Sequence, residues 1–507
     1  MKQVNRWAVL IVLSAALAII SLDNTIVNVA LPRLQEDLSA TTSQLQWVID
    51  AYSVIFAGSL LLAGSLGDRF GRRRILLTGL AIFTLGSLLA VTADNAISLT
   101  ACRALMGFGG AFIMPSTLSI LVQVFRDPKE RAQAIGTWAA VAGLGVAIGP
   151  IVGGLLLEHF SWHSIFWVNP PIAAAVFVAV LLLVPDSLDA SKPRLDLLGA
   201  LLSGLGLIAL VVTIIEVPEV GVDVLTIMSA LITVLALSSF IWWEKRVTRA
   251  LLPLQYFKQE VFSSSIVIVA MVYFALMGAM FFLPQFLQLV QGMTPLQSGI
   301  AVLPGAGGLL IASLVSPKLA HHFGTKRLVV IGMSVVTLGM VLFSFITIAT
   351  PYAYVGIVFC AIGAGLGLTL PQATNGVLAS VPSERSGMGS AVNDAMGEIG
   401  GSFGVAILGA TMSICYRQNI EDAITQAGDN IKLVPNAAIE AARESLAAAS
   451  IAGGQIPDSV ATIYRDVVGR AFVSGMTWAL LIGAGISFVG VLIAWKFLPH
   501  QIERVEE

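Results

Sequence analysis

Apolar runs long enough to cross a lipid bilayer follow one another along almost the whole chain. A helix needs about 20 apolar residues to span the hydrocarbon core, and only helices and closed barrels satisfy their backbone hydrogen bonds inside lipid. Because the runs are long and do not alternate strictly between polar and apolar residues, they are predicted to be helices. The sequence therefore predicts an all-α membrane protein with fourteen transmembrane helices, at about residues 7–31, 44–66, 74–93, 97–123, 131–157, 163–184, 196–216, 223–243, 261–290, 296–316, 326–348, 352–378, 385–415 and 469–497.

Composition agrees with this class and excludes several others. Of the 507 residues, 57% are hydrophobic and 11% are charged, whereas soluble domains carry about 25% charged residues. The net charge of −2 gives no reason to expect a nucleic-acid partner. Cys102, Cys360 and Cys415 lack the spacing of metal ligands, so no metal site is predicted. Without a phosphate-binding loop or a catalytic constellation, neither a cofactor nor an enzymatic activity is expected.

The distribution of Lys and Arg predicts how the chain is oriented in the membrane. The start MKQVNRW imitates a signal peptide, but the apolar run that follows is long and contains Asp23, so it is expected to be retained as the first helix. Most basic residues fall in alternate connections, which places both termini in the cytoplasm of a multi-pass protein of the cell (inner or cytoplasmic) membrane. On this topology the polar segment 416–468 lies outside.

Two pairs of similar segments indicate an internal repeat. AGSLGDRFGRRRILLTG at 63–79 is echoed by SPKLAHHFGTKRLVVIG at 316–332, and PKER at 128–131 by PSER at 382–385 with nearly the same separation. Paired halves with a binding site between them are typical of secondary transporters. The sequence predicts an N-terminal six-helix bundle at 1–190, two inserted helices with linkers at 191–258, and a C-terminal six-helix bundle at 259–507 that includes the loop 416–468.

Acidic residues within the apolar runs are candidates for function. Asp23 and Asp50 lie in the first two runs, where a carboxylate costs about 2.5–3.5 kcal/mol at the bilayer centre. An acid near a helix end that reaches water is the alternative, above all for Asp50. Asp394 and Glu398 are four residues apart and share one helix face. Since two close carboxylates cannot both ionise cheaply in a low dielectric, this pair is expected to carry a proton, a cation or both.

Four stretches together resemble the major facilitator superfamily, and more narrowly its fourteen-helix drug–proton antiporters, the QacA-like multidrug exporters. They are LDNTIVNVALP at 22–32, GSLGDRFGRRR at 64–74, RALMGFGGA at 103–111 and GLGVAIGPIVGG at 143–154. The resemblance implies a proton-coupled multidrug exporter, an antiporter that confers antibiotic resistance by alternating access. A proton-coupled transporter of a physiological lipid or metabolite on the same fold is the alternative. The implied partners are lipophilic or cationic small molecules, protons and the lipid bilayer, and the chain is expected to act as a monomer.

The resemblance also assigns roles to two glycine-rich motifs. The first, with Gly64, Asp68, Arg69, Gly71, Arg72 and Arg73, implies a cytoplasmic latch between helices. In it Asp68 pairs with Arg72 or faces a helix N-terminus, where the dipole favours an anion. A basic cluster that only sets topology is the alternative. The second is the antiporter motif, with a small-residue seam and a proline bend, formed by Gly145, Gly149, Pro150, Gly153 and Gly154. In the family it lines the contact between the halves, although mere tight packing is the alternative.

An arginine inside the membrane needs an acidic partner or water. For Arg103 the preferred partner is Asp23, because the first and fourth helices are neighbours in the fold that the resemblance implies, and the alternative is an arginine that snorkels to the interface. Arg103 beside Asp23 favours the ionised carboxylate, and moving it away favours protonation. Proton coupling is assigned to Asp23, Asp50, Arg103, Asp394 and Glu398.

Cargo binding is assigned to the acids and to side chains that suit a lipophilic cation. Aromatic faces attract cations and methionine adapts to varied shapes, but packing is the alternative for each. QacA-like exporters carry acids at the positions of Asn393 and Leu309, so fewer acids are expected in this cavity. The loop 416–468 is expected to be a lid or a passive spacer. The predicted substrate-binding residues are Asp23, Asn28, Trp47, Asp50, Trp138, Tyr273, Met277, Asn393, Asp394 and Glu398.

Overall fold

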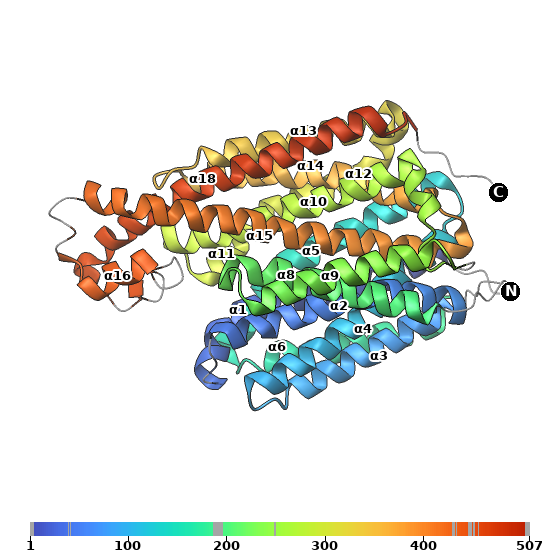
Figure 1. Cartoon of the computed structure of the whole chain (residues 1–507), viewed down its shortest axis with the longest axis horizontal. Coiled ribbons are helices and arrows are strands. Elements are labelled where there is room, and N and C mark those ends of the chain that lie inside the picture. The colour runs from blue at the N-terminus through green and yellow to red at the C-terminus, as the bar shows by residue number, and fades with distance from the viewer. Residues whose placement is uncertain are drawn as a thin grey trace.

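The computed structural model describes residues 5–38, 40, 42–185, 196–247, 250–427, 431, 433–444, 449, 452–454 and 456–501. Within these ranges the chain is helical, and fourteen helices are long and apolar enough to cross a membrane, which confirms the predicted fold class and number of spans. Figure 1 shows these helices running roughly side by side. The predicted boundary between residues 190 and 191 lies outside the described residues.

Two groups of helices stand one above the other in Figure 1. The first group supplies the first six spans, and α6 and α7 together form the sixth. The second supplies the last six, with α10 continued by a π-helical turn, η2, and with α11 and α12 forming a single span. The first group is α1 (Arg6–Leu38), α2 (Thr42–Phe70), α3 (Arg72–Ala90), α4 (Ala96–Val124), α5 (Pro128–His159), α6 (Ser164–Trp167) and α7 (Asn169–Leu183). The second is α10 (Glu260–Gln285), η2 (Phe286–Val290), α11 (Pro295–Ala301), α12 (Leu303–Phe323), α13 (Thr325–Ser344), α14 (Tyr352–Ala379), α15 (Ser386–Gln426) and α18 (Asp458–Phe497).

The two groups meet along two seams, and an extra pair of helices covers one of them. α2 packs against α15 at one seam and α5 against α12 at the other. The extra pair is α8 (Leu197–Val220) and α9 (Val224–Glu244), and α8 contacts both α2 and α15. In Figure 1 the pair lies on the viewer's side, between the two groups, and both chain termini are at the right-hand end. Short 3-10 turns η1 (Leu254–Lys258) and η3 (Ser383–Arg385) precede α10 and α15.

The internal repeat is visible in the backbone. Gly71 separates α2 from α3 with a φ of 101°, and Gly324 separates α12 from α13 with a φ of 85°. Such positive values suit glycine because it has no Cβ. The Phe-Gly pairs that matched in the sequence therefore make equivalent helix breaks in the two groups of helices.

The segment 416–468 differs from a simple loop. α15 runs for 41 residues to Gln426, and α18 begins at Asp458 and runs for 40 residues, so both helices extend beyond the predicted ends at residues 415 and 469. With α16 (Asn436–Glu444) they form the helical projection at the left of Figure 1. Tyr416 and Tyr464 hold α16 by donating hydrogen bonds to its carbonyls, at 3.0 Å to Ala442 and 3.1 Å to Ala438. Hydropathy detects only the lipid-spanning part of such helices, so the ends were predicted too short.

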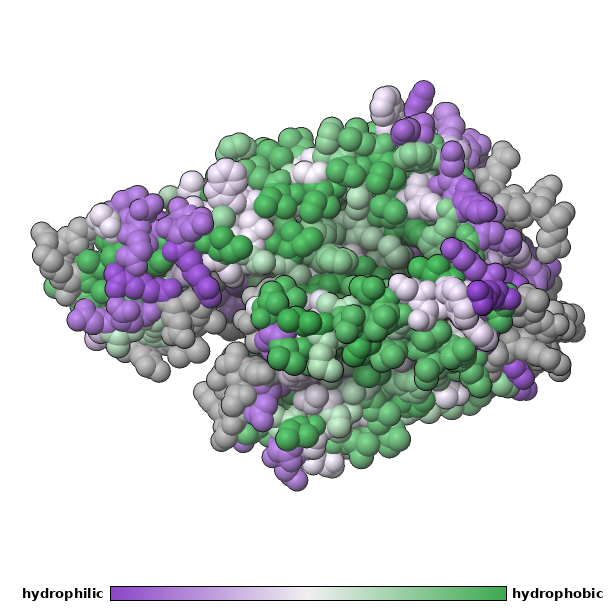
Figure 2. Space-filling view, in the orientation of Figure 1, coloured by the Kyte–Doolittle hydropathy of each residue, from purple (hydrophilic) through white to green (hydrophobic). Residues whose placement is uncertain are grey.

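The surface agrees with insertion in a bilayer. Figure 2 shows a broad hydrophobic belt across the middle of the molecule, with hydrophilic residues at the right-hand end and on the helical projection. Large apolar side chains of the spanning helices are open to the surroundings, such as Leu182 at 77% and Ile357 at 71% exposure. The chain is therefore a multi-pass membrane protein.

Candidate functional site

A buried ion pair occupies the interior of the first group of helices. Asp23 of α1 and Arg103 of α4 bind each other through Oδ2 and Nη1, and they are 0% and 1% exposed. The Arg103 Nε donates to the carbonyl of Val48 at 3.2 Å. Its guanidinium lies 4.6 Å from the centre of the Tyr52 ring, in a cation–π contact. The expected Asp23–Arg103 pairing is thus present, and it is held from both sides by α2.

Two polar residues that the sequence did not single out complete this site. The Asn169 amide donates to Asp23 Oδ1 at 2.8 Å and to Ser87 Oγ at 3.1 Å. Ser87 in turn donates to the Phe166 carbonyl at 2.8 Å. Both oxygens of the Asp23 carboxylate therefore have a donor, and cargo could reach them only if Arg103 or Asn169 moved. A polar asparagine near the start of an apolar run could have indicated this site. The sequence Asn-Pro-Pro, however, is more typical of a turn, so Asn169 was not singled out.

A second acidic site lies on α15. The Asn393 amide donates to Asp394 Oδ1 at 3.1 Å, and both residues are buried. Asp394 Oδ2 is buried without a hydrogen-bond partner among the described residues. Glu398 lies one turn further along and is half-buried. Because an ionised oxygen with no donor is costly to bury, Asp394 Oδ2 is an atom at which a proton or a cationic group would be stabilising.

An aromatic residue from another helix packs at each of these two sites. Tyr273 of α10 packs on α15 so closely that a Cβ on Gly397 would lie 3.1 Å from its ring. Tyr273 therefore packs on the turn of α15 that runs from Asp394 to Glu398. Tyr52 of α2, whose ring lies under the Arg103 guanidinium, belongs to the ion pair of the first group.

The other predicted binding residues are spread more widely. Met277 packs on α15, where a Cβ on Gly401 would lie 3.0 Å from it. Trp47 and Asp50 are half-buried near the start of α2. Trp138 is buried and donates to Thr117 Oγ1 at 3.2 Å, whereas Asn28 is exposed and donates to the Asn24 carbonyl at 3.1 Å. No hydrogen bond or ion pair within the described ranges joins Trp138 or Asn28 to the acids, so their binding roles stay predictions.

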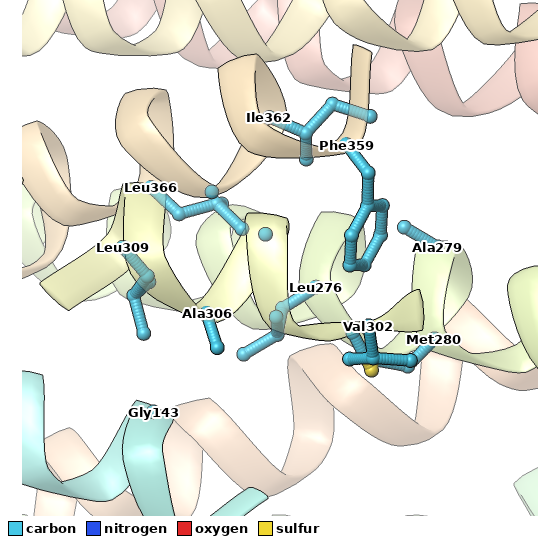
Figure 3. Close-up of a pocket in the computed structure, with 12 residues that line it drawn as sticks. Gly143, Leu276, Ala279, Met280, Val302, Ala306, Leu309, Phe359, Ile362 and Leu366 are labelled. Carbon is cyan, nitrogen blue, oxygen red and sulfur yellow. The ribbon is translucent and has the colours of Figure 1, made fainter. Parts of the chain in front are cut away.

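An apolar pocket lies where α5 faces α10, α12 and α14. Figure 3 shows Phe359, Ile362, Leu366 and Leu309 around it, with Gly143 of α5 on the opposite side. Leu309 fills the space in front of Gly143, where an added Cβ would lie 1.9 Å from Leu309 Cδ2. Leu309 stands at a position where, by the resemblance, related exporters carry an acid. In this chain it is part of the apolar wall of the pocket. The lining residues are Gly143, Leu276, Ala279, Met280, Val302, Gly305, Ala306, Leu309, Phe359, Ile362, Gly363 and Leu366.

The predicted latch residues join α2 to α15. The buried Asp68 carboxylate accepts from Arg72 at 2.8 and 3.2 Å and also from the backbone N–H groups of Gly387, at 3.0 Å, and Met388, at 3.1 Å. Arg72 also donates to the Glu384 carbonyl at 2.9 Å. Both alternatives foreseen for Asp68 therefore hold together, because it pairs with Arg72 and also faces the N-terminus of α15. We call these contacts the α2–α15 latch, and they join the two groups of helices at one of their seams.

The remaining residues of that motif have structural places around the latch. A Cβ on Gly64 would lie 2.6 Å from the Gly387 carbonyl oxygen, so glycine permits the close approach of α2 and α15. Gly71 makes the break before α3. The Arg69 guanidinium lies 5.2 Å from the Phe70 ring centre, and Arg73 donates to the carbonyl of Leu181 in α7.

The glycines of the antiporter motif lie on two faces of α5, one against α1 and the other against the second group of helices. Added Cβ atoms on Gly145, Gly149 and Gly153 would lie 2.6, 1.9 and 2.9 Å from Ser21, Thr25 and Ile26 of α1. This seam therefore packs inside the first group of helices. The contact between the groups is made by the other face of α5, where Pro150 approaches Gly299 and Gly154 approaches Leu296.

Comparisons with known proteins agree with one another. A family model described as Major Facilitator Superfamily matches residues 13–405. The multidrug efflux pump LfrA of Mycolicibacterium smegmatis is 35% identical over 490 residues, which are 96% of this chain and 96% of that protein. The tetracenomycin C resistance and export protein of Streptomyces glaucescens is 31% identical, over 96% of this chain and 91% of its own length.

Solved structures share the fold at low sequence identity. The proton:xylose symporter XylE superposes with a TM-score of 0.64 at 13% identity, over 99% of this chain and 98% of its own. The human organic anion transporter MFSD10 superposes with a TM-score of 0.62 at 14% identity, over 97% of this chain and 100% of its own. At such identities the likeness concerns the fold alone.

Proposed function

The chain belongs to the Major Facilitator Superfamily, and we propose that it is a proton-coupled multidrug exporter that moves lipophilic, cationic compounds out of the cell. It is a transporter of small molecules rather than an enzyme. The export of drugs is supported by relatives whose names describe multidrug efflux and antibiotic resistance. The observation that carries the coupling is that each group of helices holds a buried acid, Asp23 in the first and Asp394 in the second.

The binding site for a lipophilic cation combines two surfaces in this proposal. The apolar pocket, about 30 Å³ in this conformation, widens when the two groups of helices separate and then takes the hydrophobic body of the cargo, because burying apolar area is favourable by about 25 cal/mol per Å². The cationic group lies toward Asp394, Glu398 and the Tyr273 ring. Asp394 Oδ2, which lacks a donor among the described residues, accepts either a proton or the cation, so the two compete for one atom.

Asp23 serves the proton rather than the cargo in this scheme. Its two oxygens accept from Arg103 and Asn169, so the guanidinium is the counter-charge of the carboxylate in this conformation. When the α2–α15 contact opens, α2 shifts against α1 and α4 within its own unit, and with it the Val48 carbonyl and the Tyr52 ring that hold Arg103. Displacement of Arg103 removes the counter-charge of the buried carboxylate, and a proton takes its place.

The moving parts follow the internal repeat. Residues 1–190 and 259–507 act as the two rocking units, with the inserted helices of 191–258 between them. The α2–α15 latch closes the cytoplasmic end, since the start of α1 and the end of α18 lie at that end (Figure 1) and the basic connections favour a cytoplasmic location. The protein works as a monomer in the cell membrane.

Transport in inverted vesicles tests this proposal. Adding a lipophilic cation such as ethidium to energised inverted vesicles should partly discharge the pH gradient. Asp23→Asn and Glu398→Gln should abolish the discharge at equal protein levels, while Lys496→Gln, outside both the acidic sites and the latch, should retain it. Retention of exchange in both acid variants contradicts the coupling scheme. Discharge by a lipid or metabolite alone, with no response to cationic dyes, assigns the protein to a physiological cargo instead.

A further inference from the structure

A groove at the outer face of the inserted helices lies outside the transport site. It is formed near the start of α8 by Leu198 and Leu202, and near the end of α9 by Ser238, Ser239, Trp242 and Trp243. Its volume is about 430 Å³, within the range of about 300–1,000 Å³ typical of ligand pockets. The groove opens on the membrane-facing side of α8 and α9, where the neighbouring Leu201 and Leu235 are 65% and 58% exposed.

One end of the groove carries positive charge. The Arg246 guanidinium lies 4.0 Å from the centre of the Trp242 ring, so it stands directly over a lining residue. Lys245 precedes it, and both side chains are exposed. In Figure 2 the apolar surface over α8 and α9 gives way to hydrophilic residues at this right-hand end. Tryptophan and basic residues at a helix end are typical of the membrane–water interface.

The acids at this end are already engaged by the protein. Both oxygens of Asp196 accept from the Trp243 indole N–H, at 3.0 and 2.9 Å, and Asp196 Oδ1 also caps α8 at the Gly199 N–H. The Glu244 carboxylate is buried and accepts from the N–H groups of Leu251 and Leu252, at 3.1 Å each. Among the described residues of α8 and α9 at this end, the exposed charges are therefore cationic, whereas the floor of the groove is apolar and carries two hydroxyl groups.

We propose that this groove binds a phospholipid with an anionic headgroup. One acyl chain lies along Leu198, Leu202 and the indole rings, and the phosphate meets Arg246 and Lys245. A polar end with two cations above an apolar slot matches the amphipathic shape and the charge of such a lipid, and basic sites between transmembrane helices at the cytoplasmic side suit anionic headgroups. Because α8 also contacts α2 and α15, a bound lipid would stiffen the covered seam. The proposal concerns a site apart from cargo and stands independently of the proposed export.

Native mass spectrometry of the purified, delipidated full chain tests it. The protein is offered equal amounts of phosphatidylglycerol and phosphatidylcholine with the same acyl chains. Wild type should retain phosphatidylglycerol preferentially, and Lys245→Gln or Arg246→Gln should lower that preference about fivefold each. Lys496→Gln is the matched control, since this exposed lysine lies 5.2 Å from the Phe497 ring at the end of α18 and outside the groove. Soluble glycerol phosphate should not compete.

A second pair of variants tests the apolar part of the groove without changing charge. Ser239→Trp fills the slot and should reduce retention of both lipids, whereas Leu231→Trp, on the exposed surface of the same helix, should not. Equal retention of the two lipids by wild type overturns the proposal. So does an equal loss of preference in Lys496→Gln and Arg246→Gln, because that result shows only a general attraction to the basic end. Unchanged binding in Ser239→Trp also overturns it.

Discussion

Replacing Asp68 by asparagine should weaken the closed state at the latch end. Asparagine keeps the shape, but it is uncharged and has one acceptor oxygen. Its oxygen can still accept from Arg72 and Gly387, as Asp68 Oδ1 does, but its N–H₂ group then faces the Met388 N–H, which loses its acceptor. Losing one hydrogen bond to a charged group costs about 1.5–3 kcal/mol. At about 1.4 kcal/mol per factor of ten, the ratio of closed to open molecules should fall by about 10- to 150-fold.

Distances between spin labels measure this ratio directly. Cysteines at Phe70 and Phe323 occupy equivalent positions of the repeat, and both side chains are exposed, at 44% and 53%. Once the native cysteines are replaced, pulsed electron paramagnetic resonance should show one main distance in the starting protein and an added longer distance in Asp68→Asn. Lys496→Gln, at the exposed end of α18 and outside the latch, is the control and should keep the starting distance. If Asp68→Asn is folded by gel filtration and its distances match those of Lys496→Gln, the latch reasoning is wrong.

Three further changes test other parts of the structure. Gly107→Ala should lower the melting temperature of the purified protein, because its Cβ would lie 2.3 Å from the Tyr52 carbonyl oxygen and such overpacking costs about 1–3 kcal/mol. Gly307→Ala, with nothing within 4 Å of its Cβ, should leave the melting temperature unchanged or raise it. Equal changes in melting temperature for the two variants would contradict the close contact of Gly107 with α2. Asn169→Ala removes a hydrogen-bond donor from Asp23 and should slow proton-coupled efflux. If the variant has the same efflux rate and the same pH dependence as the wild type, Asn169 has no role in coupling. Tyr464→Phe loses hydrogen bonds to Ala438 and Ala449, so proteolysis of the helical projection should speed up, and an unchanged cleavage rate would count against this anchoring.

The sequence predicted most of the fold because a bilayer imposes strong rules on composition. Every span was found by its apolar length. That Arg103 needs a partner followed from the cost of a lone charge in lipid, and the choice of Asp23 followed from the helix neighbours that the family resemblance implies. The long ends of α15 and α18 were not foreseen, since beyond the membrane these helices are held by local contacts such as those of Tyr416 and Tyr464, and hydropathy carries no signal for them.

The parts of the site that escaped prediction depend on tertiary contacts between ordinary groups. Asn169 is uncharged, so its presence in a span does not demand a partner as strongly as a charge does. The N–H groups of Gly387 and Met388 are available at the start of α15 as at any helix, and only the packing of α2 on α15 brings Asp68 to them. The glycine seam of α5 predicted a close neighbour, but not that α1 would provide it.

Proton release on cargo binding tests the central claim most directly. Purified transporter in weakly buffered solution is mixed with a lipophilic cation, and the change in pH is followed with an indicator dye. If Asp394 and Glu398 bind either a proton or the cation, saturating cargo should release protons, and Glu398→Gln should release fewer at the same occupancy. Full binding of cargo with no proton released at any pH contradicts the account.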